Sequence, residues 1–82
     1  MTDRTVNLTY FAGRGGSWRL SVGADRIATF RDGPVQRRLA YITAERAAKI
    51  FMEDDIEIVG PEVQVERMKL MNGLMAMSEA AA

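Results

Sequence analysis

The chain has 82 residues, with 11 basic and 11 acidic side chains and neither cysteine nor histidine. A chain of this length forms one domain, so we expect residues 1–82 to fold as a single unit. The lack of cysteine excludes disulfides, and the lack of both residue types excludes the common zinc sites. Because so short a chain buries a thin core, oligomerisation is the source of extra stability that we expect.

The composition is that of a folded, water-soluble domain, with 48% hydrophobic and 27% charged residues. No apolar run approaches the roughly 20 residues needed to cross a bilayer. The first residues do not have the pattern of a signal peptide. We therefore expect a cytoplasmic protein.

The zero net charge conceals two oppositely charged halves. Residues 1–50 carry nine basic and four acidic side chains, a net of +5, whereas residues 51–82 carry two basic and seven acidic ones, a net of −5. Such an asymmetry suits a charged partner. Alternatively, the two halves neutralise each other within one chain or across a dimer.

Alternating apolar and polar residues predict strands in the first third of the chain. The alternation covers residues 5–11 and then Trp18–Val22, and the glycine-rich Gly13–Gly16 between them predicts a hairpin turn. A third strand is predicted over Ile27–Phe30. The Asp-Gly-Pro sequence at residues 32–34 ends it.

The segment Val35–Ile42 fits two structures. As a strand, Val35, Leu39 and Tyr41 share one face; as a helix, Val35, Leu39 and Ile42 lie at positions i, i+4 and i+7. The Asp-Gly turn before the segment and the β-formers at its end favour a fourth strand. The helix remains the alternative.

A short helix is predicted over Ala44–Met52, because Thr43 is a good N-cap and alanines line one side. Ile56–Val59 is predicted as a strand, and Gly60-Pro61 ends it and starts a second helix. That helix is apolar over a wider arc than a surface helix needs. We therefore expect a homodimer whose interface is formed by Met68, Leu70, Met71, Leu74, Met75 and Met77.

These elements predict an α+β domain. We expect a small, mostly antiparallel sheet of three to five strands, one short helix and a longer apolar C-terminal helix.

The sequence has no pattern that specifies a catalytic chemistry. Without cysteine or histidine, and with no serine in a nucleophile elbow, we expect neither an enzyme nor a cofactor. The Gly13–Gly16 segment could cradle a phosphate, but such loops join a strand to a helix, and this one precedes a predicted strand.

Two groups of charged residues are candidate contacts for a partner. The acidic group has oxygen ligands that suit Ca²⁺ or Mg²⁺, but its spacing is not that of an EF-hand loop. We interpret it as a solvated turn that can meet a basic partner; it consists of Glu53, Asp54, Asp55 and Glu57. The basic group consists of Arg14, Arg19, Arg31, Arg37 and Arg38.

Nucleic-acid binding is the main alternative. The arginines are interleaved with Tyr10, Phe11, Phe30 and Tyr41, and basic sheets with exposed aromatic residues bind single strands. The pI of 6.2 argues against this function, because nucleic-acid-binding domains are commonly basic.

The compact, cysteine-free and histidine-free chain, with a hairpin at Val6–Val22, late helices and split charge, resembles a class of small proteins. These are the anti-defence proteins of phages and mobile elements, including type I anti-CRISPR proteins. The resemblance implies binding to a multi-subunit Cascade-type CRISPR complex and blocking of its target DNA. We thus predict a non-enzymatic protein-binding inhibitor, with a small nucleic-acid-binding regulator that uses an arginine-rich sheet face as the alternative.

Overall fold

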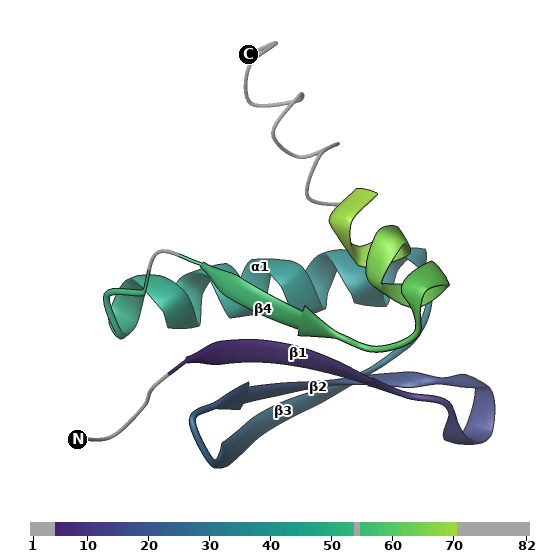
Figure 1. Cartoon of the computed structure of the whole chain (residues 1–82), viewed down its shortest axis with the longest axis horizontal. Coiled ribbons are helices and arrows are strands. Elements are labelled where there is room, and N and C mark those ends of the chain that lie inside the picture. Colours follow the sequence, from purple (N-terminus) through teal and green to yellow (C-terminus); the bar gives the residue numbers. More distant parts are fainter. Residues whose placement is uncertain (1–4, 54, 71–82) are drawn as a thin grey trace, which may run out of the picture.

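A computed structural model describes residues 5–53 and 55–70. Four strands form one mixed sheet in the order β3-β2-β1-β4 (Figure 1). Their bounds are β1 (Val6–Phe11), β2 (Ser17–Val22), β3 (Asp25–Arg31) and β4 (Ile56–Val59). Strands β1 and β2 pair antiparallel, and so do β2 and β3. Strands β1 and β4 pair parallel. The first three predicted strands, the hairpin and the strand at Ile56–Val59 are thereby confirmed.

The same alternation decides which side chains enter the core. Val6 pairs with Val22 and Ile56, and the next inward residue, Leu8, pairs with Leu20 on β2. Successive side chains of a strand point to opposite faces, so these apolar residues share one face of the sheet. The polar residues between them lie on the other face.

Helix α1 (Pro34–Ile50) spans 17 residues and corrects two predictions. The segment Val35–Ile42 is helical and not a fourth strand. The helix that was predicted to be short therefore starts earlier in the chain and is long. Thr43 lies inside it, and its hydroxyl donates to the Leu39 carbonyl oxygen at 2.7 Å instead of capping an N-terminus. The helix forms because Pro34 fits its first turn and small residues recur at helical spacing on its inner side.

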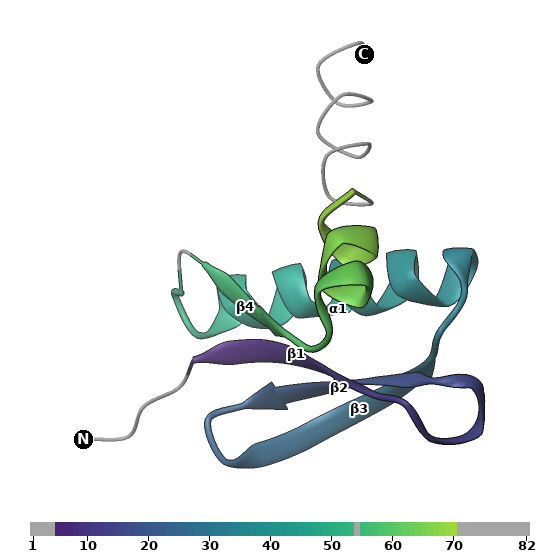
Figure 2. The same ribbon diagram turned by 45° about the vertical axis from the view of Figure 1, so that its right-hand side comes forward.

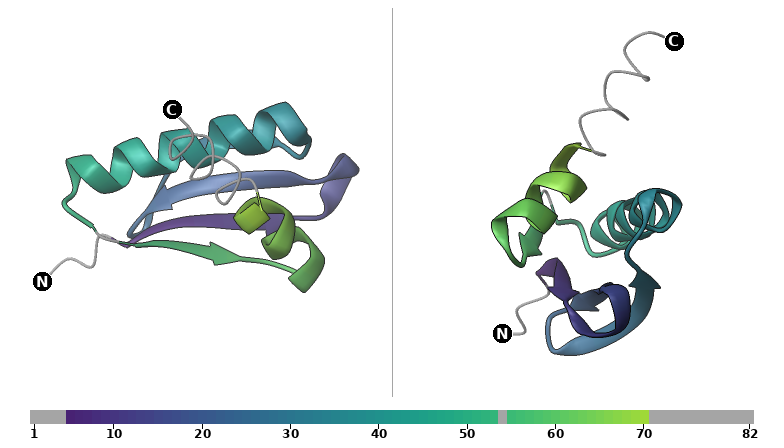
Figure 3. Two further views of the ribbon diagram at one scale, coloured as in Figure 1. Left: turned by 90° about the horizontal axis from the view of Figure 1, so that it is seen from above. Right: turned by 90° about the vertical axis from the view of Figure 1, so that its right-hand side faces the viewer.

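A second helix begins at residue 62, after Gly60-Pro61, and is described as far as residue 70. Both helices lie on the same side of the sheet (Figures 1 and 3). The predicted longer apolar helix continues into residues 71–77, which lie outside the described residues. Within the described part of the chain, no helix is long and apolar enough to cross a membrane.

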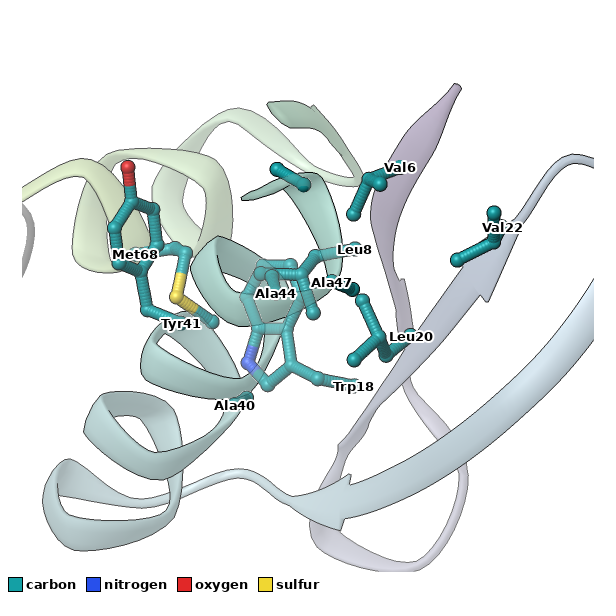
Figure 4. Close-up of a cluster of buried hydrophobic side chains, with 11 residues drawn as sticks. Val6, Leu8, Trp18, Leu20, Val22, Ala40, Tyr41, Ala44, Ala47 and Met68 are labelled. Atoms are coloured by element: carbon teal, nitrogen blue, oxygen red, sulfur yellow. The ribbon is translucent and has the colours of Figure 1, made fainter. Parts of the chain in front are cut away.

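The core lies between the sheet and α1, and Met68 joins it from the second helix (Figure 4). Trp18, Leu8, Leu20, Met68 and Val6 are its largest fully buried side chains. Alanines on the inner side of α1 bring the helix close to the sheet, because they present little side-chain volume. The buried residues of α1 are Ala40, Tyr41, Ala44, Ala47 and Ala48.

Tyr10 occupies a space that two glycines leave open. A Cβ added at Gly60 would lie 2.8 Å from the Tyr10 Cβ, and one at Gly16 would overlap the Tyr10 hydroxyl. Gly16 also has φ of +95°, a conformation that costs other residues free energy. Gly16 in the hairpin and Gly60 after β4 therefore leave the space that the Tyr10 side chain fills.

Replacing Gly16 by alanine should lower the free energy of unfolding by about 2 kcal/mol, through backbone strain and the overlap with Tyr10. Gly13→Ala is the matched control, since a Cβ at Gly13 meets nothing within 4 Å. Urea unfolding of both variants checks this. Equal stability of the two variants would contradict the described packing of Tyr10.

Candidate binding surface

One face of the sheet is left uncovered by the described residues. Both helices lie over the other face, as the views in Figures 2 and 3 agree. The register aligns the outward residues in rows: Thr9 with Arg19 and Thr29, and Phe11 with Ser17 and Arg31. The row at the opposite end of the sheet holds Glu57, Asn7, Ser21 and Arg26. Val59 on β4 pairs with Thr9, so the uncovered face is mostly polar, with arginines on β2 and β3 and the exposed apolar residues Phe11 and Val59.

Three of the five predicted basic residues gather at one end of this face, which we call the arginine end: Arg14, Arg19 and Arg31. Arg31 pairs with Ser17, so it is the diagonal neighbour of Arg19 at a Cα separation of about 7–8 Å. The Arg19 guanidinium lies over the Phe11 ring, with Cζ 4.0 Å from its centroid. This cation–π contact holds Arg19 against the sheet while its charge remains at the surface.

Arg14 has an uncommon backbone conformation. It lies in the turn between β1 and β2, with φ of 53° and ψ of 47°, in the left-handed region. A left-handed conformation costs a non-glycine residue about 1–2 kcal/mol, a cost that Gly15 and Gly16, which also have positive φ, avoid. The Arg14 side chain is exposed.

The other two predicted basic residues lie on α1, outside this surface. Arg37 Nη1 donates to Asp32 Oδ1 at 2.8 Å, and both side chains are largely buried, at 14% and 9% exposure. Trp18 Nε1 donates to the same oxygen at 3.1 Å. Arg37 therefore ties the start of α1 to strand β2, whereas Arg38 is exposed.

The environment of Asp32 favours its charged form. Burial alone would raise the pKa of Asp32, but hydrogen bonds from Arg37 and Trp18 and the charges of Arg37 and Arg67 outweigh burial and lower it. On α1, burial and the charge of Glu45 raise the pKa of Tyr41. From the sequence, Asp32 was recognised only as part of a turn, because its partners are 14 and 5 residues away.

The predicted acidic group lies at the other end of the sheet. Glu53 and Asp55 precede β4, and Glu57 pairs with Asn7 at the start of β1. Asp55 and Glu57 are exposed, and Asp54 lies outside the described residues. Among the described residues, no group of three or more acidic side chains is arranged to hold a metal ion. The sheet therefore has a basic end and an opposite end with Asp55 and Glu57, which we call the acidic end although Arg26 also lies there.

The positions of the aromatic residues argue against a surface on which nucleic-acid bases stack. Trp18 and Tyr41 are buried, and Tyr10 and Phe30 pack against the core. Only Phe11 among these five lies on the uncovered face, with 38% of its surface exposed. The arginine-rich sheet predicted for nucleic-acid binding is therefore present in part, but most of its aromatic residues belong to the core.

The predicted dimer interface is divided in the same way. Met68 is fully buried within the chain, so its assignment to a contact between subunits is corrected. Leu70 is 65% exposed. Met71, Leu74, Met75 and Met77 lie outside the described residues.

Asp32→Asn should lower the free energy of unfolding by about 2 kcal/mol, because the buried Arg37 loses its charged partner. The pKa of Asp32 is lowered on folding, so this contribution is fully present above the ordinary value of 3.8. It is lost as the pH falls below that value, and the two stabilities should then converge. Urea unfolding across this range checks both points, with the exposed Asp25→Asn as control.

No protein-family model matches the chain, and no curated protein or solved structure matches it either. The uncovered sheet face is therefore the feature of the molecule that bears on its function. The distinctive features of that face are the arginine end, the strained Arg14 and the acidic end.

Proposed function

We propose that this chain is a non-enzymatic protein-binding domain that inhibits a larger complex by occupying one of its surfaces. The observation that carries the proposal is the uncovered sheet face with its arginine end. The strands that form this face are held in place by the core between the sheet and α1, on the other side of the sheet. The exposed face therefore stays ordered without a covering layer. It presents an ordered, twisted contact surface (Figure 1).

The charge arrangement supports a protein as the partner. Arg14, Arg19 and Arg31 lie at one end of the sheet, and Asp55 and Glu57 at the other. A surface of two signs fits a partner with the complementary pattern and suppresses binding to others. A nucleic acid is uniformly negative and would be repelled at the acidic end.

The resemblance in overall form to anti-defence proteins extends the proposal to its target. The target would be a Cascade-type CRISPR complex in the cytoplasm, and binding would block its access to target DNA. The lack of cysteine and histidine in the whole chain supports inhibition by binding and not by catalysis.

Nucleic-acid binding is the second candidate, and Phe11 with Arg19 on the uncovered face favours it. An aromatic ring beside a guanidinium is a platform on which a base can stack. In that case affinity would fall steeply with salt, since phosphate contacts release counterions.

Replacing Arg14 by glycine should raise the free energy of unfolding by up to about 1 kcal/mol, through relief of the left-handed backbone. The same change should weaken partner binding, because the arginine end loses a charge. Met52→Gly is the matched control: Met52 also has positive φ, of 57°, and lies at the other end of the molecule, after α1. It should gain stability and bind as before. Unchanged binding by the Arg14 variant would contradict its proposed role.

A binding assay with a purified Cascade-type complex tests the proposed target. The chain should bind the complex and prevent its association with target DNA, and nuclease treatment should leave the bound chain in place. Arg19→Glu with Arg31→Glu should abolish binding. Binding to free DNA with a steep salt dependence, and none to the complex, would instead establish the second candidate.

A further inference from the structure

The side of α1 that faces away from the sheet carries an apolar stripe. Val35 is 76% exposed and Leu39 47%, and Ile42 is partly exposed. These residues are four and then three positions apart, so they form one row along the helix. Val35, Leu39 and Ile42 have the i, i+4, i+7 spacing that defined the helical alternative in the sequence. Their side chains lie on the surface of α1 and not in the core.

Basic residues accompany this row. Arg38, Arg46 and Lys49 are all exposed on the same side of α1, and Glu45 lies at its border. We call the whole set the α1 stripe: Val35, Arg38, Leu39, Ile42, Arg46 and Lys49. Arg46 continues the apolar row four residues after Ile42, and Arg38 and Lys49 lie along the border of the row on the Ile42 side.

The second helix has the opposite character on its outer side. Met68 points into the core, so residues turned away from it face outward: Val63 is 58% exposed and Leu70 65%. Glu62 and Glu66 are exposed beside them. We call this set the helix-2 face. Arg67 and Lys69, the residues on either side of Met68, are exposed at the two borders of this face.

We propose that two copies of the chain form a symmetric dimer in which the α1 stripe of each copy packs on the helix-2 face of the other. The α1 stripe and the helix-2 face are complementary, because an apolar row bordered by arginine and lysine meets an apolar row bordered by glutamate. Within one chain the two surfaces cannot meet, because the second helix already turns Met68 toward α1 and its core. A twofold axis satisfies both surfaces at once and closes the assembly.

This dimer extends the one expected from the C-terminal helix by assigning the surface that receives it. It also gives the opposite charges of the two halves of the chain a place where they meet. The sheet face takes no part, so the inference stands apart from the proposed function.

Charge exchange between the two surfaces tests the dimer. Wild-type protein should sediment with twice the mass of a single chain at high micromolar concentration. Arg38→Glu with Arg46→Glu should give monomers, and so should Glu62→Lys with Glu66→Lys, because each places like charges at both contacts. An equimolar mixture of the two variants should recover the dimer, since both contacts of the mixed pair again join opposite charges.

Circular dichroism verifies that the variants remain folded, and the substituted positions are exposed. Arg19→Glu with Arg31→Glu on the sheet is the control and should leave the dimer intact. A monomeric wild type would overturn the proposal, as would a mixture that stays monomeric. A monomeric wild type that binds vesicles of anionic phospholipid would assign the α1 stripe to a membrane surface instead.

Discussion

The contact between Trp18, Asp32 and Arg37 is the interaction on which the arrangement of the molecule depends. The indole ring is fully buried and meets Tyr10 edge-on, with ring centroids 5.2 Å apart. Its N–H needs a partner in that environment, and Asp32 supplies one. Asp32 in turn accepts from Arg37. One carboxylate therefore joins the centre of the sheet to the first turns of α1.

This connection decides which face of the sheet is covered. Asp32 lies directly after β3, so α1 must begin there and run back over the face that holds Trp18. The opposite face is left to polar residues that need no cover, such as Thr9, Ser17 and Thr29. A small domain with a single-sided sheet thus obtains a stable core and a rigid exposed surface from the same strands. The left-handed Arg14 lies at the edge of that surface, and its backbone conformation lowers stability there.

The strands were predictable because a period of two is visible within each segment. The segment Val35–Ile42 was mispredicted because the β-formers at its end received more weight than its helical spacing. The alanines at positions 40, 44, 47 and 48 repeat a helical spacing on the opposite, buried side of the helix and allow it to approach the sheet. The parallel pairing of β4 with β1 joins segments some fifty residues apart, and no local pattern reports it.

The candidate site, like the fold, was only partly predictable from local sequence patterns. Arg37 and Arg38 are adjacent in sequence, yet one is held by Asp32 and the other is exposed on α1. A count of charges treats them alike, whereas the rotation of a helix separates them. Met68 likewise follows the apolar pattern of the second helix but belongs to the core of its own chain. Only Arg14, Arg19 and Arg31 of the predicted basic group share one surface, because Arg14 precedes β2 and the pairing of β2 with β3 brings Arg31 close to Arg19.

The central claim is that the uncovered sheet face is the binding surface. Because the chain has no cysteine, a single cysteine can report on each face through its rate of maleimide labelling. We would introduce Thr29→Cys on the uncovered face and Gln36→Cys on α1, both at exposed positions. Saturating amounts of a purified Cascade-type complex should slow labelling at position 29 and leave position 36 unchanged. Protection at position 36 alone, or at neither position, would contradict the account.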